Sequence, residues 1–266
     1  MAFEVLRVDS VKAAAALLAS DGGARFIGGG TIAVRDVNYG DGSVSRLVLP
    51  EGLKLDLIQV EAGKASLGAA VTMAKVEAHP QLGFLKPVAH SIGGPAIRAM
   101  ATVGGNLFAP YPFGDFTVAM LALGAVVTVE GSKGPQTLDL EDFLSRTRNP
   151  AKIVVSLAFE LPDALRFTKV VRRKPHGASV LSVAAVLPIV GGVVSGARIA
   201  YGAMGPRPMR ARAVEAALEG RTLEAVAIAA AVKQATVGCA PLTDPQASAW
   251  YRNEVLPIHL QRLLSA

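Results

Sequence analysis

Apolar and polar residues alternate along the chain with two periods, and each period predicts a type of secondary structure. Up to about Pro162, short apolar runs typical of strands alternate with longer runs at helical spacing. The elements expected there are a helix over 9–20 capped by Asp9 or Ser10, strands at 24–31 and 45–50, a hairpin over 55–71, helices over 72–79, 82–101 with a break at 93–95, and 116–125, a hairpin over 126–140, a helix at 141–147 and a strand at 152–162. This mixture predicts an α+β fold.

The pattern changes after Ala164, where three strands are followed by three helices. The expected strands are 166–174, 179–194 with its own turn, and 195–205, and the expected helices are 210–220, 222–235 and 245–264. Asp244 is the expected N-cap of the last helix, because Pro245 is favoured at a first helical position. Consecutive strands predict an antiparallel meander, so we expect a smaller α+β domain over 163–266 after a first domain over 1–162.

Composition and charge narrow the class of protein. Hydrophobic residues make up 51% of the chain, but the longest apolar runs contain Gly or Pro and are shorter than the ~20 residues that cross a bilayer. Acids at Glu4 and Asp9 precede the first apolar stretch, so we expect no secretory signal and a cytoplasmic location. Lys and Arg number 27 against 21 acids, but the densest basic run, residues 169–174, lacks interleaved aromatics. We therefore expect a solvated or subunit-facing strand edge there and no nucleic-acid partner.

Cysteine and histidine usage limits the cofactors that this chain can hold by itself. Cys239 is the only cysteine, so the chain has neither an internal disulfide nor the four thiolates of an iron–sulfur cluster. We expect Cys239 to be a small buried side chain rather than a nucleophile. The four histidines, at positions 79, 90, 176 and 259, include no pair with zinc-motif spacing, so no metal site is expected.

Two glycine-rich stretches interrupt the regular pattern, FIGGGTIAV at 26–34 and TVGGN at 102–106. The segment 97–115 is expected to form neither a good helix nor a good strand, because its glycines weaken both and its prolines cannot donate backbone hydrogen bonds. Consecutive glycine amides can converge on an anion, so either stretch could hold phosphate; the alternative is a tight turn. Neither has Rossmann or P-loop spacing, which argues against a standard nicotinamide or ATP domain.

Polar side chains beside the two stretches favour a ligand over simple turns. Thr31, Thr102 and Asn106 offer hydrogen-bond donors to phosphate or ribose. Asp115, shortly after the second stretch, can accept hydrogen bonds from a ribose or ribityl hydroxyl. Together these residues suit a long cofactor with two phosphates.

In these stretches the chain resembles the FAD-binding, or medium, subunits of the molybdenum hydroxylase (xanthine dehydrogenase) family, such as that of carbon monoxide dehydrogenase. The family has an A-G-G-T-D-L-type loop and then I-R-n-x-A-T-I-G-G-N with an Asp shortly beyond; this chain has GGGTIAV, IRAMATVGGN and Asp115. The likeness continues through ASLGAAVTMAKVEAHPQL, FTKVVRR, ARIAYGAMGPRPMRARAVEAALEG and ASAWYRNEVLP. Gly28 in place of the usual Ala and Ile32 in place of the usual Asp are departures.

The resemblance implies a fold and a set of cofactor contacts. It implies two FAD-binding subdomains of the vanillyl-alcohol oxidase (PCMH) type, about 1–55 and 56–162, and then a C-terminal domain with a three-stranded antiparallel sheet and a helix bundle. By matching position, the implied FAD contacts are Ile27, Gly28, Gly29, Gly30, Thr31, Ile32, Ala33, Val34, Gly93, Thr102, Val103, Gly104, Gly105, Asn106, Asp115, Ile153, Val154 and Lys169. Neither loop contains a histidine or cysteine, and His90 nearby is better explained as a helix-surface residue, so FAD is expected to be non-covalent.

The implied function is that of a flavoprotein electron-transfer subunit. FAD would take electrons from the 2Fe-2S clusters of a small subunit, fed by the molybdenum cofactor of a large subunit, in a heterotrimer or its dimer, a heterohexamer. No catalytic residue is required in this chain. Two alternatives remain, a stand-alone flavin oxidase or dehydrogenase of the vanillyl-alcohol oxidase class and an assembly subunit without FAD. The organic substrate stays open, as does the acceptor among NAD, a quinone, a carrier protein and oxygen.

Overall fold

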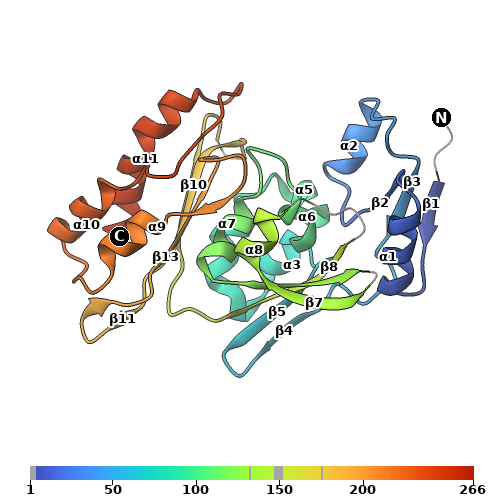
Figure 1. Cartoon of the computed structure of the whole chain (residues 1–266), viewed down its shortest axis with the longest axis horizontal. Helices are drawn as coiled ribbons and strands as arrows, with labels where there is room; N and C mark the ends of the chain where they lie inside the picture. Colours follow the sequence, from blue (N-terminus) through green and yellow to red (C-terminus); the bar gives the residue numbers. More distant parts are fainter. Residues whose placement is uncertain (1–3, 132, 147–151, 175) are drawn as a thin grey trace.

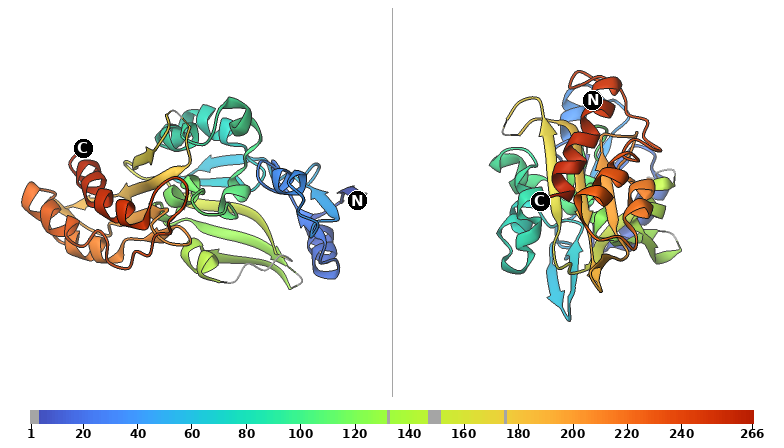
Figure 2. Two further views of the ribbon diagram at one scale, coloured as in Figure 1. Left: turned by 90° about the horizontal axis from the view of Figure 1, so that it is seen from above. Right: turned by 90° about the vertical axis from the view of Figure 1, so that its left-hand side faces the viewer.

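In the part of the chain that the structure describes, three sheets of three or more strands follow one another along the molecule, with the N-terminal sheet at one end and the C-terminal helices at the other (Figures 1 and 2). The computed structural model describes residues 4–131, 133–146, 152–174 and 176–266. Residue 132, in the turn of the hairpin expected over 126–140, and residue 147, the expected end of the helix over 141–147, lie outside the described residues. No described helix combines the length and the apolar character needed to cross a membrane.

The N-terminal sheet is parallel and has the strand order β1-β3-β2. Its elements are β1 (Glu4–Arg7), α1 (Val11–Ser20), β2 (Ala24–Phe26), α2 (Ala33–Asn38) and β3 (Arg46–Leu49). Ser10 is the N-cap of α1, because its side chain accepts a hydrogen bond from the Ala13 amide. The sequence pattern did not predict α2, which begins directly after the first glycine-rich stretch.

The central sheet is antiparallel throughout, in the order β4-β5-β8-β6-β7. Its strands are β4 (Ile58–Glu61), β5 (Lys64–Gly68), β6 (Val126–Gly131), β7 (Gly134–Asp139) and β8 (Ile153–Glu160). The two pairs β4–β5 and β6–β7 are the hairpins expected from the sequence. The strand β8, last in sequence, lies between them and pairs with both β5 and β6. The strands β5 and β8 are therefore neighbours in the sheet although 84 residues (69–152) separate them in sequence, and no local pattern predicts such a pairing.

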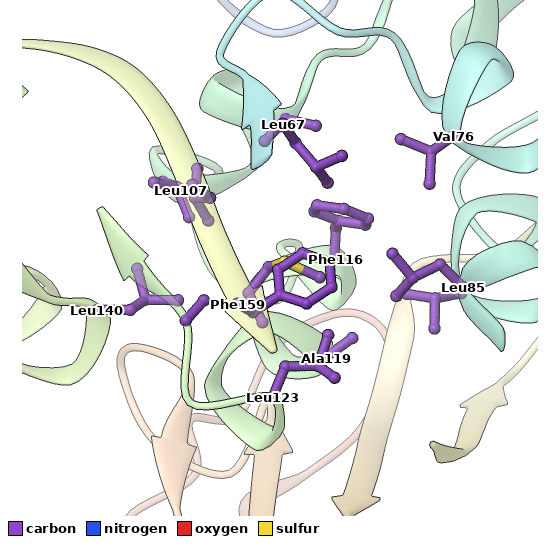
Figure 3. Close-up of a cluster of buried hydrophobic side chains, with 14 of the residues drawn as sticks. Leu67, Val76, Leu85, Leu107, Phe116, Ala119, Leu123, Leu140 and Phe159 are labelled. Atoms are coloured by element: carbon purple, nitrogen blue, oxygen red, sulfur yellow. The ribbon is translucent and has the colours of Figure 1, made fainter. Parts of the chain in front are cut away.

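Short helices lie on or beside the central sheet, and all except the helix at Pro95–Met100 contribute buried residues to the core shown in part in Figure 3. They are α3 (Met73–Ala78), a 3-10 helix η1 (Pro80–Leu85), α4 (Lys86–His90), α5 (Pro95–Met100), α6 (Val103–Leu107), α7 (Asp115–Ala122) and α8 (Leu140–Ser145). Thr72 caps α3, a role that the sequence pattern did not predict, and Pro95 begins α5 at its first position, at the break expected over 93–95. The expectation of irregular structure over 97–115 is wrong for α6, because the Thr102 side chain caps this helix and overrides the weak propensity of its glycines.

The C-terminal sheet has the order β14-β13-β10-β9, so a short fourth strand extends the three expected from the sequence. Its elements are β9 (Arg166–Val171), β10 (Ser179–Val186), β13 (Arg198–Gly202) and β14 (Met209–Arg210), with a separate hairpin of β11 (Ile189–Val190) and β12 (Val193–Val194). All eight residues of β10 are buried. Both faces are covered, because α7 packs on one side and the C-terminal helices pack on the other (Figure 1).

The C-terminal helices are α9 (Arg212–Leu218), α10 (Ala225–Val232) and α11 (Ala249–Leu264). The N-cap expected for the last helix is wrong: α11 begins at Ala249, and Ser248 accepts the capping hydrogen bond from the Tyr251 amide. Asp244 instead accepts hydrogen bonds from the amides of Gln246 and Ala247 in the turn before the helix. The carboxylate thus forms a local turn that competes with helix initiation at Pro245.

Candidate functional site

A cavity of about 580 Å³ lies between the N-terminal unit (β1 to β3 with α1 and α2) and the helices that accompany the central sheet. It is within the size range of small-molecule and cofactor sites. Its walls come from β2 and α2 on one side and from α5, α6 and the loop before α7 on the other. The lining residues are 26–33, Arg35, Asp36, Ile92, Gly93, Ile97, Ala101, Thr102, Gly105, Asn106, 108–110, 113–115, Lys169, His176 and Gly177.

The first glycine-rich stretch forms one wall and packs closely against the other. A Cβ on Gly28 would overlap the Thr102 hydroxyl, and one on Gly29 would overlap the carbonyl oxygen of Met100. Gly30 has a φ of +67°, in the left-handed region that favours glycine. These glycines therefore serve two purposes, close contact between the walls and a sharp turn into α2.

The amides of this first stretch are available to a ligand. Near the start of the stretch Ile27 donates to the Val48 carbonyl, and at its end Val34 donates to the Gly30 carbonyl. Across the described part of the chain, no acceptor takes the amides of residues 28–32. These residues are only partly buried and line the cavity. Consecutive unpaired amides beside a cavity fit an anion such as a pyrophosphate.

The second stretch differs, because its amides are already bonded within the protein. Val103 donates to the Val71 carbonyl at 2.9 Å and Gly104 to the Ala69 carbonyl at 2.8 Å. The Gly105 amide donates to the Thr102 hydroxyl at 3.1 Å. The expectation that this stretch forms a second anion nest is therefore wrong. Thr102 and Asn106 still face the cavity, so this wall offers side chains and not amides.

Asp115 lies in the same wall as a buried ion pair. Its Oδ2 is 2.8 Å from Nζ of Lys169, and its Oδ1 accepts a 2.7 Å hydrogen bond from the Ser179 hydroxyl. The Lys169 ammonium also donates to the Ser91 carbonyl at 2.9 Å. The two side chains are 6% and 10% exposed. The pair thus places fixed charges at the cavity, in a position held by three separate chain segments.

A second charged cluster supports the wall near Gly93. Glu77 pairs with Nδ1 of His90 at 2.7 Å and with Nε of the buried Arg98 at 2.7 Å. The hydrogen bond from His90, together with Arg98, holds the pKa of the Glu77 carboxyl below its ordinary value. Arg98 also donates to the carbonyls of His90 and Gly93. The cluster therefore fixes Gly93, which lines the cavity with a φ of +56°.

Most contacts implied by the resemblance line this cavity, but five lie behind its wall. Those five are Val34, Val103, Gly104, Ile153 and Val154. A Cβ on Gly104 would lie 3.0 Å from the Ala69 carbonyl oxygen, so this glycine serves packing of α6. Ile153 belongs to the small core beneath α1, and Val154 belongs to the core of the central sheet.

The described part of the chain contains one thiol, that of Cys239, and no candidate metal site. It contains no group of three His, Cys, Asp or Glu side chains placed to hold a metal ion. Cys239 is half-buried, and its thiol donates weakly to the Ala235 carbonyl. Burial raises the pKa of this thiol to about 11. Cys239 is not among the residues that line the cavity.

The sequence of the chain matches two known protein-family domains. The family described as the FAD binding domain in molybdopterin dehydrogenase matches residues 1–163, and the CO dehydrogenase flavoprotein C-terminal domain matches residues 166–266. The chain belongs to the molybdopterin dehydrogenase FAD-binding family. This match confirms the expected family and the order of its two domains.

Relatives of this flavoprotein-family chain match most of its length. The 6-hydroxypseudooxynicotine dehydrogenase complex subunit alpha of Paenarthrobacter nicotinovorans is 30% identical to this chain. The aligned region covers 99% of this chain and 93% of the relative. The nicotinate dehydrogenase FAD-subunit of Eubacterium barkeri is 29% identical, over 74% of the chain and 72% of the relative.

Solved structures confirm the expected α+β fold. Quinoline 2-oxidoreductase from Pseudomonas putida 86 is 26% identical, with a TM-score of 0.89 over 100% of this chain and 96% of that one. Reconstituted CO dehydrogenase from Oligotropha carboxidovorans is 24% identical, with a TM-score of 0.91 over 100% and 97%. At this lower identity the likeness establishes the arrangement of the chain alone.

Several residues that line the cavity of this family member were not predicted from the sequence. They are Arg35 and Asp36 on α2, Phe113 before α7, and His176 and Gly177 before β10. Phe113 follows two prolines, which mark a loop but not the direction of the side chain. His176 follows the basic run, and no spacing connects it with the glycine-rich stretches. Of these residues, His176 and Gly177 are distant in sequence from both glycine-rich stretches, so only the tertiary fold brings them to the cavity.

Proposed function

We propose that the cavity binds FAD non-covalently and that the chain is the electron-transfer flavoprotein subunit of a molybdenum hydroxylase. The observation that carries this proposal is the run of amides at residues 28–32, for which the described residues supply no acceptor, in the same cavity as the ion pair of Asp115 and Lys169. Membership of an FAD-binding family supports the identity of the ligand. FAD, when bound, supplies a redox group that exchanges electrons with both one-electron and two-electron partners.

Each wall has a separate task in this proposal. The amides of the first stretch hold the pyrophosphate, and Thr102 and Asn106 donate to the nucleotide from the opposite wall. Asp115 and Lys169 orient the polar groups of the cofactor. The five contacts behind the wall, which include Gly104 and Ile153, act by supporting the lining residues.

We propose partners and a domain division on the same basis. A small 2Fe-2S subunit and a large molybdenum subunit would supply the electrons, since the single cysteine rules out a cluster ligated by this chain alone. A relative named as a dehydrogenase complex subunit supports a multi-subunit enzyme. The proposed domains are 1–162, with subdomains of about 1–55 and 56–162, and 163–266. The gaps between β3 and β4 and between β8 and β9 support these divisions.

Measurement of flavin content tests the binding site. Gly30→Ala should lower the amount of FAD per folded chain severalfold, because a side chain at this positive φ would distort the amide run. Gly63→Ala is the matched control: Gly63 also has a positive φ, but it lies in the β4–β5 turn with open space around its Cβ position. Equal flavin content in the two variants, each at wild-type level, would refute the proposed pyrophosphate site.

A stopped-flow experiment tests the place of the flavin in electron transfer. The purified chain, loaded with FAD, should not be reduced by the organic substrate identified from the native complex. Reduction should appear when the iron–sulfur and molybdenum subunits are added. Rapid bleaching of the flavin in the chain alone would instead support the stand-alone flavin oxidase or dehydrogenase.

A further inference from the structure

Tyr111 joins the loop between α6 and α7 to the C-terminal domain. Its hydroxyl lies 3.0 Å from the carbonyl oxygen of Leu242 and 3.3 Å from that of Ala203, and it accepts a hydrogen bond from the Leu242 amide. One hydroxyl thus both donates and accepts across the two domains. Tyr111 does not line the cavity, but Pro110 and Phe113 in the same loop do.

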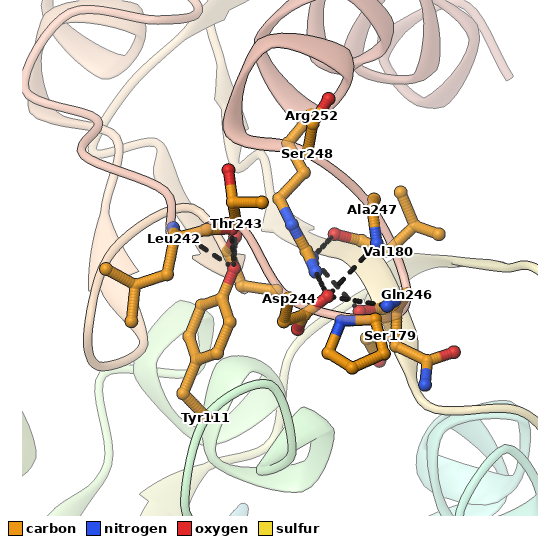
Figure 4. A network of polar contacts seen from close by, with 12 residues as sticks. Tyr111, Ser179, Val180, Leu242, Thr243, Asp244, Gln246, Ala247, Ser248 and Arg252 are labelled. Atoms are coloured by element: carbon orange, nitrogen blue, oxygen red, sulfur yellow. Dashed lines mark hydrogen bonds and ion pairs between the residues drawn. The ribbon is translucent and has the colours of Figure 1, made fainter.

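Arg252, on α11, packs against the same tyrosine (Figure 4). Its guanidinium carbon is 5.2 Å from the centre of the Tyr111 ring, within the range of a cation–π interaction. Nη1 donates to the carbonyls of Ser179 and Val180, and Nη2 is 2.7 Å from Oδ1 of Asp244. The side chain is 0% exposed. A charge buried this completely is tolerated only with such partners, so their positions are tightly linked.

Ser179 continues these contacts to the cavity wall. Its carbonyl accepts from Arg252, while its hydroxyl donates to Oδ1 of Asp115 at 2.7 Å. Asp115 lines the cavity at the start of α7 and pairs with Lys169. Arg252 therefore connects with the wall by two routes, through the ring of Tyr111 and through Ser179.

We propose that Tyr111, Asp244 and Arg252 form a positioning clasp, through which the C-terminal helices set the geometry of the cavity wall. The inference rests on the proposed FAD site and deepens it, because it makes the C-terminal domain a determinant of flavin affinity and of the flavin's surroundings. None of the three residues touches the cavity, so each acts through the loop before α7 or through Asp115. If the three residues merely held the domains together, substitutions at them would change stability but not FAD binding.

Tyr111→Phe is the decisive variant, because it removes the bridging hydroxyl and keeps the ring beneath Arg252. The dissociation constant for FAD, measured by flavin fluorescence, should rise about threefold to tenfold. At saturating FAD, the visible circular dichroism of the bound flavin should also change. Tyr251→Phe is the matched control, since Tyr251 is exposed on the same helix as Arg252.

The outcomes separate this inference from the proposed function. If the wild-type chain takes up no FAD, the proposed function fails. If the wild-type chain binds FAD and Tyr111→Phe matches it in both affinity and dichroism, the clasp is overturned even when the variant is less stable to heat. Weaker binding with an altered dichroism spectrum, absent from Tyr251→Phe, supports the clasp.

A second variant tests the route through Ser179. Arg252→Lys keeps the charge but loses the planar fork that reaches two carbonyls and a carboxylate, so FAD binding should weaken as in Tyr111→Phe. Arg262→Lys, exposed on the same helix, is its control. In a Ser179→Ala background, the effect of Arg252→Lys on the FAD dissociation constant should shrink. Full additivity of the two changes would exclude the Ser179 route, and should Arg252→Lys fail to fold, Tyr111→Phe alone decides.

Discussion

At the scale of single residues, neighbouring glycines near the cavity face different surroundings. A Cβ on Gly104 would lie 2.9 Å from the Ala69 side chain and 3.0 Å from its carbonyl oxygen, within the buried packing of α6. A Cβ on Gly105 would meet only the Thr102 hydroxyl at 3.0 Å, on the side that faces the cavity. The sequence treats the two glycines alike, but the fold assigns one to packing and one to the site.

Gly104→Ala and Gly105→Ala should therefore have different effects. Gly104→Ala should lower the free energy of unfolding by about 1–3 kcal/mol through overpacking. Gly105→Ala should change stability by less than about 1 kcal/mol, because alanine favours the helix, but should weaken FAD binding. Denaturant unfolding and FAD titration of both proteins measure the two effects. Loss of FAD binding in a fully stable Gly104→Ala protein would contradict the assignment.

The Cys239 thiol is expected to react slowly. Burial raises its pKa from an ordinary 9.0 to about 11, so the thiolate at pH 8 should be about a hundred times scarcer than for an exposed cysteine. Alkylation of the folded chain by iodoacetamide, followed by mass spectrometry, measures the rate. The same chain unfolded in urea is the control, and equal rates in the two states would show that the thiol is not protected.

At the scale of elements, one carboxylate joins three helices behind the cavity. Glu77 comes from α3, His90 from α4 and Arg98 from α5, and the two basic side chains bind the two oxygens of Glu77. None of these helices is longer than six residues. Helices this short are marginal by themselves, so tertiary contacts such as this cluster hold them in place.

Acid should lower the free energy of unfolding, because Glu77 becomes protonated. The pKa of Glu77 is lowered in the folded chain, so its contribution to stability is present above the ordinary value of 4.5 and is lost as the pH falls through the folded value. Glu77→Gln should cost about 1–2 kcal/mol at neutral pH, because Arg98 loses a charged partner. It should also flatten the loss of stability below pH 4.5. Urea unfolding between pH 3 and pH 7 measures both, and identical pH profiles would contradict this account.

At the scale of the whole molecule, the cavity draws on all three units. Its walls come from the N-terminal unit, from the helices of the central unit and, through Lys169 and His176, from the C-terminal domain. A ligand bound there contacts each unit and stabilises only their folded arrangement. Binding and folding are therefore coupled.

FAD should raise the thermal stability of the entire chain. At a free concentration of 100 times the dissociation constant, bound FAD should add about 2.7 kcal/mol to the free energy of unfolding. Differential scanning calorimetry should show this as a higher midpoint that increases further with FAD concentration. Riboflavin, which lacks the pyrophosphate, is the control and should give a smaller shift. Equal shifts from FAD and riboflavin would argue that the amide run does not hold phosphate.

Most of the local elements, and the family, could be recognised from the sequence alone. Ser10 was one of two predicted caps of α1, and the hairpins β4–β5 and β6–β7 were recognisable from strand periodicity and glycine turns. These features depend on residues a few positions apart, where side-chain capping and turn geometry dominate. Both glycine-rich stretches contribute to the cavity wall, where a Cβ on Gly28 or Gly29 would overlap the opposite side.

The contacts between these elements follow from the tertiary structure alone. Asp115 meets Ser179 across 64 positions of sequence, and Arg252 meets Ser179 across 73. The amides of Val103 and Gly104 are occupied because Val71 and Ala69 fold against α6. Asp244 caps a turn because Arg252 and two amides surround it. Burial, which makes each of these contacts strong and selective, arises only when distant segments pack together, and so no local pattern reports it.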